Sequence, residues 1–359
     1  MSILKIKRVH FHTFDSLRFL SFLLVFLHHS PIPNSHFLHY FTKSGGVGVS
    51  FFFVLSGFLI TYILILEKLN NDNKVPLKKF FWRRILRIWP LYYAMVLFAF
   101  CTPYILNLLN IGYSNEGYQP NWFFTLTFLE NYVMMYKNEF PNVSPLIVMW
   151  SLCIEEHFYI IWGLIFYFIS LKNIPKLIIA SIVLAFVSTV IYKNYNIPTS
   201  DILSNIHYFA FGAIPAYLFV FKKDFLSKIE SIPSVSKYFY AVFVVVAIVV
   251  CTNIPVMPDE KYSSIFFGVL FSILILFTLG EKNVFKISDD SILAKLGKYT
   301  YGLYLFHTIC INFFIKIGSN LDLNWIAITL LSFGSTLILS FLSYHLFEKQ
   351  FLKLKQKDN

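Results

Sequence analysis

The chain alternates between long apolar blocks and short polar stretches. The apolar blocks cover residues 14–31, 47–66, 88–109, 158–171, 177–192, 202–221, 238–251, 263–280, 299–317 and 325–346. Counting the polar start of the fourth block, most of them reach the roughly 17–25 residues that an α-helix needs to cross a bilayer. The pattern therefore predicts an all-α polytopic membrane protein with about ten transmembrane helices. A further apolar run at 123–135 is a candidate interfacial or re-entrant piece.

Composition and charge placement support this prediction. The chain is 57% hydrophobic and only 14% charged, whereas soluble domains carry about 25% charged residues. Its net charge of +11 would also fit a nucleic-acid partner. However, if the N-terminus is cytoplasmic and ten helices alternate, 24 of the 30 Lys and Arg residues fall in cytoplasmic segments. This positive-inside bias predicts that both termini are cytoplasmic. It attributes the basic charge to the topology of a chain in the lipid bilayer, and not to a nucleic-acid partner.

The rest of the composition points to one membrane domain. Four cysteines stand singly in apolar segments, so we expect neither a metal site nor a disulfide framework: Cys101, Cys153, Cys251 and Cys310. We find no internal repeat and no low-complexity tract. We therefore expect a single domain over 1–359, with its spans within roughly 14–346, a basic cytoplasmic tail at 347–359 and no appended soluble domain.

Ionisable side chains inside a membrane span are costly and mark functional sites by default. In the first expected span, Arg18 lies near the cytoplasmic end and His29 near the outer end. They are almost three turns apart, so they project from nearly the same face, about 16 Å apart along the axis. Asp15 precedes Arg18 by one turn and can pair with it. His28 points about 100° away from His29, so we give it no shared role.

The fourth expected span begins outside with a polar stretch, MWSLCIEEHFY. Glu155 sits one or two turns into it, which places it at about the depth of His29. A carboxylate on one ring nitrogen of a histidine fixes the tautomer and leaves the other nitrogen free as a base. We therefore predict that Glu155 pairs with His29 in the outer half of the membrane. Ser151 lies one turn earlier on the same face.

Three further features stand out along the chain. Arg84 and Arg87 share a helix face at the cytoplasmic entrance of the third span, and paired guanidinium groups suit phosphate oxygens. Ser56 and Gly57 lie in a stretch rich in small residues, which favours close helix packing. His307 lies within the ninth span, where a core hydrogen bond and a site role are equally good interpretations.

Five segments match motifs of one known family. They are Arg18 followed after ten residues by His29, then GGVGVSFFFVLSGFLIT, RRILRIWP, WSLCIEEHFY and YTYGLYLFH. In this order they resemble the acyltransferase-3 family of multi-pass membrane acyltransferases, which includes O-acetylases of surface polysaccharides and nodulation factors, and macrolide acylases. The sequence departs from the family at two places. His157 stands where glutamine is usual, and Glu348 is followed by Lys-Gln where Glu-x-Pro is common.

The resemblance implies an enzyme of the bacterial inner membrane that transfers an acyl group, usually acetyl from acetyl-CoA, without a permanently bound cofactor. The acceptor would be a hydroxyl of a surface polysaccharide, lipopolysaccharide or glycolipid. His29 would be the catalytic base or a transient acyl carrier, oriented by Glu155. The implied donor-binding residues are Arg18, Arg84 and Arg87. Candidates for the acceptor site or channel lining are Asp15, Ser56, Ser151, His157 and His307.

A second class of function stays open at this point. Buried Arg, His and Glu side chains also mark proton-coupled transporters and flippases of lipid-linked glycans. Transporters often contain inverted repeats with broken helices, and we find no such pairing in the sequence. Acyl transfer predicts that loss of His29 removes an ester from a glycan that is still exported. A transporter or flippase predicts loss of the exported glycan itself.

Overall fold

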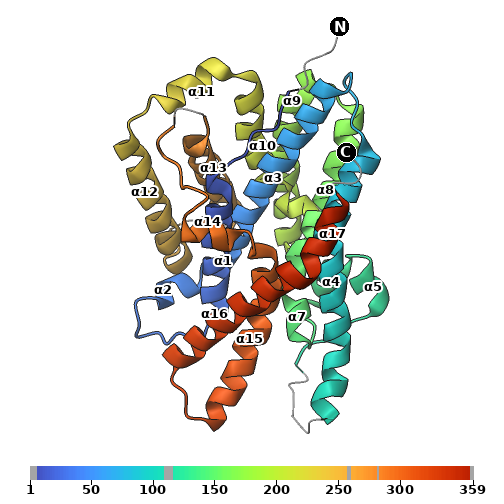
Figure 1. The fold of residues 1–359 in the computed structure, drawn as a ribbon, viewed down its shortest axis with the longest axis vertical. Helices are drawn as coiled ribbons and strands as arrows, with labels where there is room; N and C mark the ends of the chain where they lie inside the picture. The colour runs from blue at the N-terminus through green and yellow to red at the C-terminus, as the bar shows by residue number, and fades with distance from the viewer. Residues whose placement is uncertain (1–5, 109–115, 257–259, 281–282, 356–359) are drawn as a thin grey trace.

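The structure is a computed structural model that describes residues 6–108, 116–256, 260–280 and 283–355 (Figure 1). Over these ranges it contains helices and one isolated bridge between Tyr118 and Pro141, but no strand. The ten longest helices coincide with the ten expected spans: α1 (Thr13–His29), α3 (Gly45–Asn70), α4 (Leu77–Leu108), α8 (Trp150–Phe168), α9 (Ile174–Asn194), α10 (Ile202–Phe221), α12 (Ser234–Asn253), α13 (Glu260–Thr278), α15 (Thr300–Asn320) and α16 (Trp325–Leu342). The all-α prediction is confirmed.

Among the residues that the structure describes, eight helices are long and apolar enough to cross a membrane. They are α3, α4, α8, α9 with the preceding turn, α10, α12, α15, and α16 with its C-terminal extension. The two other expected spans are α1, with 17 residues, and the apolar part of α13, Tyr262–Thr278. The chain is therefore a multi-pass membrane protein. The fifth and seventh apolar blocks looked short, but α9 and α12 extend them with polar residues at their ends.

Shorter helices connect these long ones: α2 (His39–Thr42), α5 (Trp122–Leu126), α6 (Glu130–Lys137), α7 (Ser144–Ile147), the 3-10 turn Leu171–Asn173, α11 (Lys223–Glu230), α14 (Ile292–Gly297) and α17 (Lys349–Leu354). The candidate interfacial piece at 123–135 falls in α5 and α6. A π-helical turn, Ser343–Glu348, joins α16 to α17 without a break. In Figure 1, α2 and α7 lie toward the end of the molecule opposite to α11.

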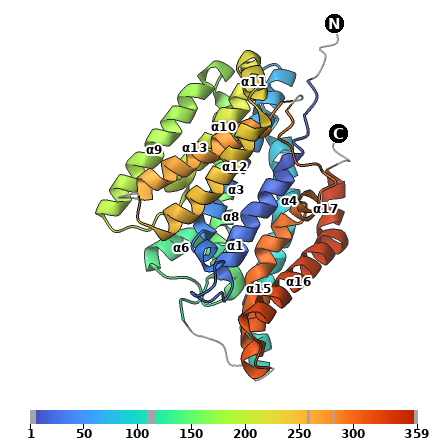
Figure 2. The same cartoon turned by 90° about the vertical axis from the view of Figure 1, so that its left-hand side faces the viewer.

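Helix α3 lies at the centre of the bundle and packs against α1, α8, α10 and α13. In Figure 2, α9, α10, α12 and α13 lie to one side of it and α15 and α16 to the other. Its contact with α10 is backbone to backbone. A Cβ atom at Gly57 would lie 2.1 Å from the carbonyl oxygen of Phe209, and one at Gly212 would lie 1.9 Å from that of Val54. Gly57 therefore serves packing, as its small-residue context predicts.

Two contacts set the position of α1. Ile6 and Asn70 exchange backbone-to-side-chain hydrogen bonds, and Arg8 pairs with Glu67, so the segment before α1 is tied to the end of α3. On the other side, Gly297 at the end of α14 touches Asp15. A Cβ there would lie 1.9 Å from the Asp15 carbonyl oxygen. This close approach brings the first turn of α15 beside the first turns of α1.

Candidate active site

One cavity of about 490 Å³ lies among α1, α3, α4, α8, α15 and the π-helical turn. Its volume falls in the range of about 300–1,000 Å³ that small-molecule sites occupy. Seven of the ten residues singled out from the sequence line it: Asp15, Arg18, Ser56, Arg84, Arg87, Ser151 and Glu155. The structure thus brings most of the polar residues that were unexpected in membrane spans into one space.

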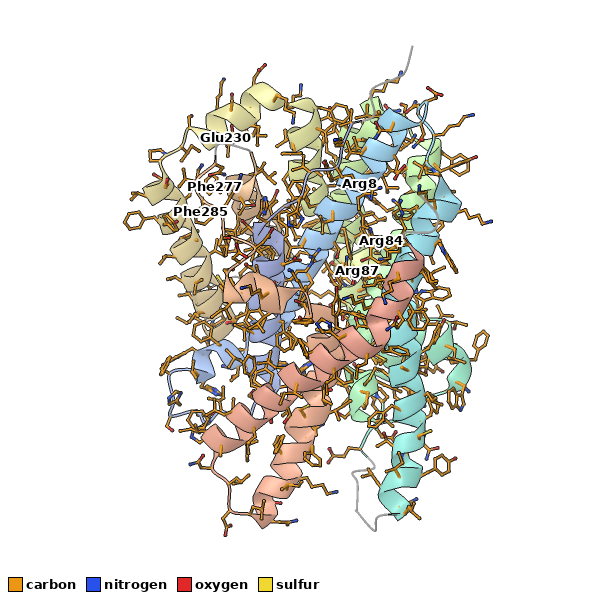
Figure 3. All side chains as sticks on the ribbon, in the orientation of Figure 1. Arg8, Arg84, Arg87, Glu230, Phe277 and Phe285 are labelled. Atoms are coloured by element: carbon orange, nitrogen blue, oxygen red, sulfur yellow. The ribbon has the colours of Figure 1, made fainter. Side chains whose placement is uncertain are left out.

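Three arginines, Arg18, Arg84 and Arg87, line this cavity. Arg18 donates a hydrogen bond of 2.6 Å to Asp15, which confirms the pairing expected from their spacing. The Arg84 guanidinium lies 5.8 Å from the centre of the Tyr159 ring, and its Nε has no hydrogen-bond partner among the described residues. Arg87 is exposed. In Figure 3, Arg8 lies above Arg84 and Arg87, which are labelled close together near the centre of the view.

More basic groups line the same cavity: His10, Lys298 and Lys355. Lys355 follows α17 directly, just beyond the last expected span. Burial, together with the charges of Arg87 and Arg84, lowers the pKa of Lys355 to about 7. A bound anion would relieve this repulsion. The cluster therefore favours phosphate groups, which arginines hold with paired hydrogen bonds.

Glu155 has hydrogen-bond partners other than the predicted one. It accepts hydrogen bonds from the hydroxyl groups of Ser56 and Tyr159. Ser56 belongs to the middle of α3, and Tyr159 follows Glu155 by one turn in α8. No hydrogen bond joins Glu155 to His29 within the described ranges. The carboxylate instead belongs to the cavity that Arg84 lines.

The depth at which α8 begins explains why Glu155 does not pair with His29 as predicted. Ser151, in the first turn of α8, forms a hydrogen bond of 2.7 Å with the hydroxyl of Tyr304, in the second turn of α15. The start of α8 therefore lies inside the bundle, beside a part of α15 expected near the cytoplasm. The short helix α7 comes just before it and also packs on α15. Counting residues from an outer surface consequently placed Glu155 too far out.

His29 lies outside the lining of this cavity and next to another histidine. Its ring centre is 5.2 Å from that of His307 and 4.8 Å from that of His28. His28 is exposed, and its Nδ1 donates to the carbonyl oxygen of Thr42. This agrees with the expectation that His28 and His29 do not share a role. The His307 ring in turn lies 5.7 Å from the ring of Tyr304, which lines the cavity. Tyr304 and His307 thus connect the cavity to His29.

His157 also lies outside the cavity lining. Its ring stacks on Tyr132 with the ring centres 5.5 Å apart. Its neighbour Glu156 is buried and accepts a hydrogen bond of 3.1 Å from the indole of Trp89. The candidate role of His157 in the acceptor site therefore has no support from its position.

Several lining residues were missed in the sequence: Tyr159, Tyr301, Tyr304, Glu348 and Lys355. Tyr159, Tyr301 and Tyr304 belong to the WSLCIEEHFY and YTYGLYLFH segments, so those segments held the signal. Glu348 is buried and accepts a hydrogen bond of 3.0 Å from Ser343 across the π-helical turn. Such turns often occur at functional sites because the extra residue re-aims neighbouring side chains.

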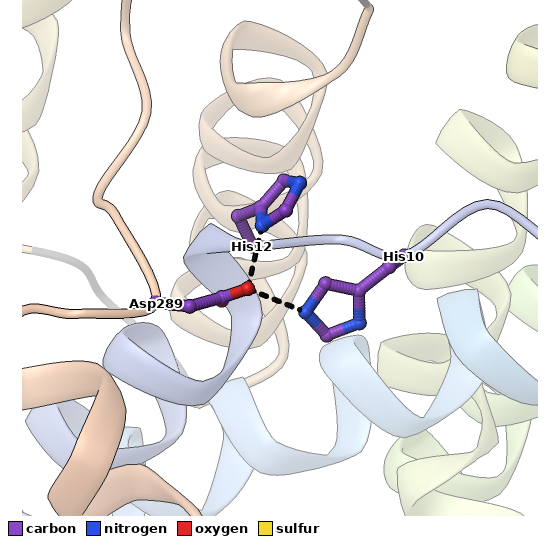
Figure 4. Close-up of side chains that lie close together, drawn as sticks. All are labelled: His10, His12 and Asp289. Atoms are coloured by element: carbon purple, nitrogen blue, oxygen red, sulfur yellow. Dashed lines mark hydrogen bonds and ion pairs between the residues drawn. The ribbon is translucent and has the colours of Figure 1, made fainter.

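One set of side chains has the chemistry to hold a metal ion, although the sequence led us to expect no metal site. His10 Nε2 and His12 Nδ1 lie 3.0 and 2.7 Å from the same carboxylate oxygen of Asp289 (Figure 4). The three ligand atoms lie within 4.8 Å of one another, and both imidazoles are exposed. Hydrogen bonds to Asp289 account for this arrangement without an ion. The cluster fastens the segment before α1 to the segment before α14.

Comparison with known proteins adds a family relationship. A family model described as an acyltransferase domain matches residues 11–345. The peptidoglycan O-acetyltransferase OatA of Listeria monocytogenes is 27% identical over 361 residues, which cover 95% of this chain and 56% of that protein. The O-acetyltransferase OatA of Staphylococcus aureus is 28% identical over 317 residues, covering 82% of this chain and 49% of that protein.

A third relative, the putative peptidoglycan O-acetyltransferase YrhL of Bacillus subtilis, is 36% identical over 155 residues, covering 41% of this chain and 22% of that protein. The chain spans about half the length of the first two relatives. No solved structure matches it.

Proposed function

Because this chain belongs to the acyltransferase-3 family, we propose that it is a membrane O-acyltransferase. It transfers an acyl group, in the simplest case acetyl, from acyl-CoA to a hydroxyl group of a surface glycan or glycolipid. The observation that carries this proposal is the single cavity in which Arg18, Arg84 and Arg87 gather. Three guanidinium groups in one cavity suit the phosphate groups of a CoA donor.

The donor would enter from the side expected to face the cytoplasm. Its phosphates bind the arginines and Lys355, which line the basic part of the cavity. Apolar side chains, among them Val49, Phe52 and Phe53, line the cavity along α3 and suit the slender pantetheine arm. The thioester then points toward Tyr304 and His307, beyond which His29 lies.

The chemistry needs a base and no metal ion. A sugar hydroxyl attacks the thioester carbonyl carbon while His29 takes its proton, and such help is typically worth about 10²–10⁴-fold in rate. The new C–O ester bond forms, the C–S bond breaks, and the departing CoA thiolate takes the proton from His29. The base returns to its neutral form, and acyl-CoA plus hydroxyl have become ester plus CoA.

The acceptor is a glycan on the outer side of the bacterial inner membrane. Two relatives are named for peptidoglycan, so peptidoglycan of the host is the first acceptor to assay. Lipopolysaccharide, exopolysaccharide and glycolipid follow where the host makes them. The transporter alternative predicts a different phenotype and is separated by the same experiment.

The test measures alkali-labile acyl ester in the surface glycan of a deletion strain that carries wild-type protein, His29→Ala or His28→Ala at equal membrane abundance. His28→Ala is the matched control because His28 is exposed and bonds to Thr42. We expect His29→Ala to lose the ester and His28→Ala to keep it, with glycan quantity unchanged. Ester that persists in His29→Ala contradicts the proposal, and loss of the glycan itself supports the transporter.

A further inference from the structure

We propose that His307 is the positioning residue for His29. It takes the role that the sequence analysis predicted for Glu155. This inference rests on the proposed function. It assigns to His307 the task of setting which nitrogen of His29 carries the proton and which way the ring faces.

The hydrogen bond fixes the tautomer of His307. Its Nδ1 lies 2.7 Å from the backbone carbonyl oxygen of Tyr304. A carbonyl oxygen can only accept, so Nδ1 carries the proton. In the neutral ring Nε2 then holds a lone pair and can only accept. The backbone of α15 thus presents a fixed acceptor at Nε2.

That acceptor is buried and unused. His307 is fully buried, and its Nε2 has no hydrogen-bond partner among the described residues. Buried polar atoms are rarely left without a partner. His29 is the nearest polar ring that can supply a donor. A ring-centre separation of 5.2 Å leaves about 2.9 Å between two nitrogens that face each other, which is an ordinary hydrogen-bond length. The proposed contact requires the half-buried His29 ring to turn about its Cβ–Cγ bond until one of its nitrogens faces Nε2 of His307.

The other candidate partners of His29 are engaged or unsuitable. Glu155 accepts from Ser56 and Tyr159. His28 donates to Thr42 on the exposed side of the helix. When the N–H of His29 donates to His307, the second nitrogen of His29 keeps its lone pair for the substrate hydroxyl. Once His29 takes that proton, its hydrogen bond to His307 becomes charge-assisted and stronger.

Tyr304 links this pair to the donor cavity. Its carbonyl oxygen accepts the hydrogen bond from His307. Its hydroxyl bonds to Ser151, and Tyr304 lines the cavity. One turn of α15 therefore holds both the end of the donor cavity and the partner of the base. His307 also has a packing role, because Phe22 lies edge-on to its ring with the ring centres 5.9 Å apart. A Phe substitution keeps the packing and removes the acceptor, whereas Gln keeps an acceptor, so the two variants separate packing from positioning.

The experiment uses the full chain in inverted membrane vesicles of the host, with [14C]acetyl-CoA as the probe and alkali-labile label in endogenous glycan as the readout. His307→Phe keeps the volume and removes the acceptor, whereas His307→Gln keeps an acceptor oxygen. His207→Phe is the control, because His207 is also buried, in α10, and neither of its nitrogens has a partner among the described residues.

We expect His307→Phe to lower kcat by about 10²-fold or more at an unchanged KM for acetyl-CoA, since the contribution at stake is that of a general base. His307→Gln should recover most of this loss, and His207→Phe should keep wild-type kcat. If His307→Phe does not accumulate, His307→Leu takes its place. A Phe or Leu variant with wild-type kcat overturns the inference, and so do Gln and Phe variants that lose activity equally. His29→Ala that still labels glycan overturns the proposed function instead.

Discussion

Ser151 and Tyr304 form a hydrogen bond of 2.7 Å that joins the first turn of α8 to the second turn of α15. Both side chains are buried, and both also reach the backbone carbonyl oxygen of Val148. This contact sets how deep α8 begins. It places Glu155, one turn further along α8, beside Ser56 and in the cavity that Arg84 lines. The arrangement of the site follows from this depth.

Tyr304→Phe should therefore cost stability and activity together. Two hydrogen bonds disappear, each worth about 1 kcal/mol, so the free energy of unfolding should fall by about 1–2 kcal/mol. The rate of acyl transfer should fall as α8 loses its anchor. Thermal unfolding in detergent and ester formation in vesicles measure the two effects. Tyr136→Phe, at a side chain that is 91% exposed, should change neither.

Arg87→Ala should weaken donor binding without removing the chemistry. A hydrogen bond to a charged group contributes about 1.5–3 kcal/mol, so the KM for acetyl-CoA should rise by roughly tenfold or more. Arg83→Ala is the matched control, because Arg83 lies in the same RRILR run and faces Glu67 at 3.8 Å. Equal effects of the two substitutions on KM would contradict the assignment of Arg87 to the donor.

Lys355 predicts a pH dependence of donor binding. Burial, with the charges of Arg87 and Arg84, lowers its pKa to about 7. Below that pH the free protein already holds a cation there, and above it the site must take up a proton when phosphate binds. The affinity for CoA should therefore fall as the pH rises through about 7. Equilibrium binding of labelled CoA across neutral pH checks this.

Lys355→Gln should flatten that profile and weaken binding on its acid side. Lys353→Gln serves as the control, since Lys353 is exposed and bonds to Gln350. A profile with the wild-type slope in Lys355→Gln would show that another group titrates.

Gly57→Ala should disturb the contact between α3 and α10. The added Cβ would lie 2.1 Å from the carbonyl oxygen of Phe209, so the two helices must separate. Overpacking of this kind costs about 1–3 kcal/mol, which thermal unfolding in detergent measures. Gly334→Ala in α16 has open space around the new Cβ and should be neutral or slightly stabilising. Equal stability of the two variants would mean that α3 and α10 do not pack this closely.

The features that depend on local sequence were predictable. Apolar length gave the ten long helices, and spacing along one helix gave the Asp15–Arg18 pair. The failure of Glu155 to pair with His29 was not predictable, because it depends on where α8 begins in the membrane. That position is set by the fold of the short helices before it, which hydropathy does not encode.

Contacts between segments far apart in the sequence could not be predicted either. Asp289 meets His10 and His12 across more than 270 residues of sequence, and no local pattern joins them. Glu348 was noted only as a departure from a motif, whereas the structure buries it in the lining of the cavity.

In the proposed reaction, His29 transfers a proton while the acyl group moves from CoA to a glycan hydroxyl. The most direct measurement is the initial rate at which inverted vesicles move label from [14C]acetyl-CoA into alkali-labile glycan ester, with His29→Ala compared to His28→Ala at equal abundance. We expect a rate at background for His29→Ala and a wild-type rate for His28→Ala. A wild-type rate in His29→Ala would show that His29 is not the base.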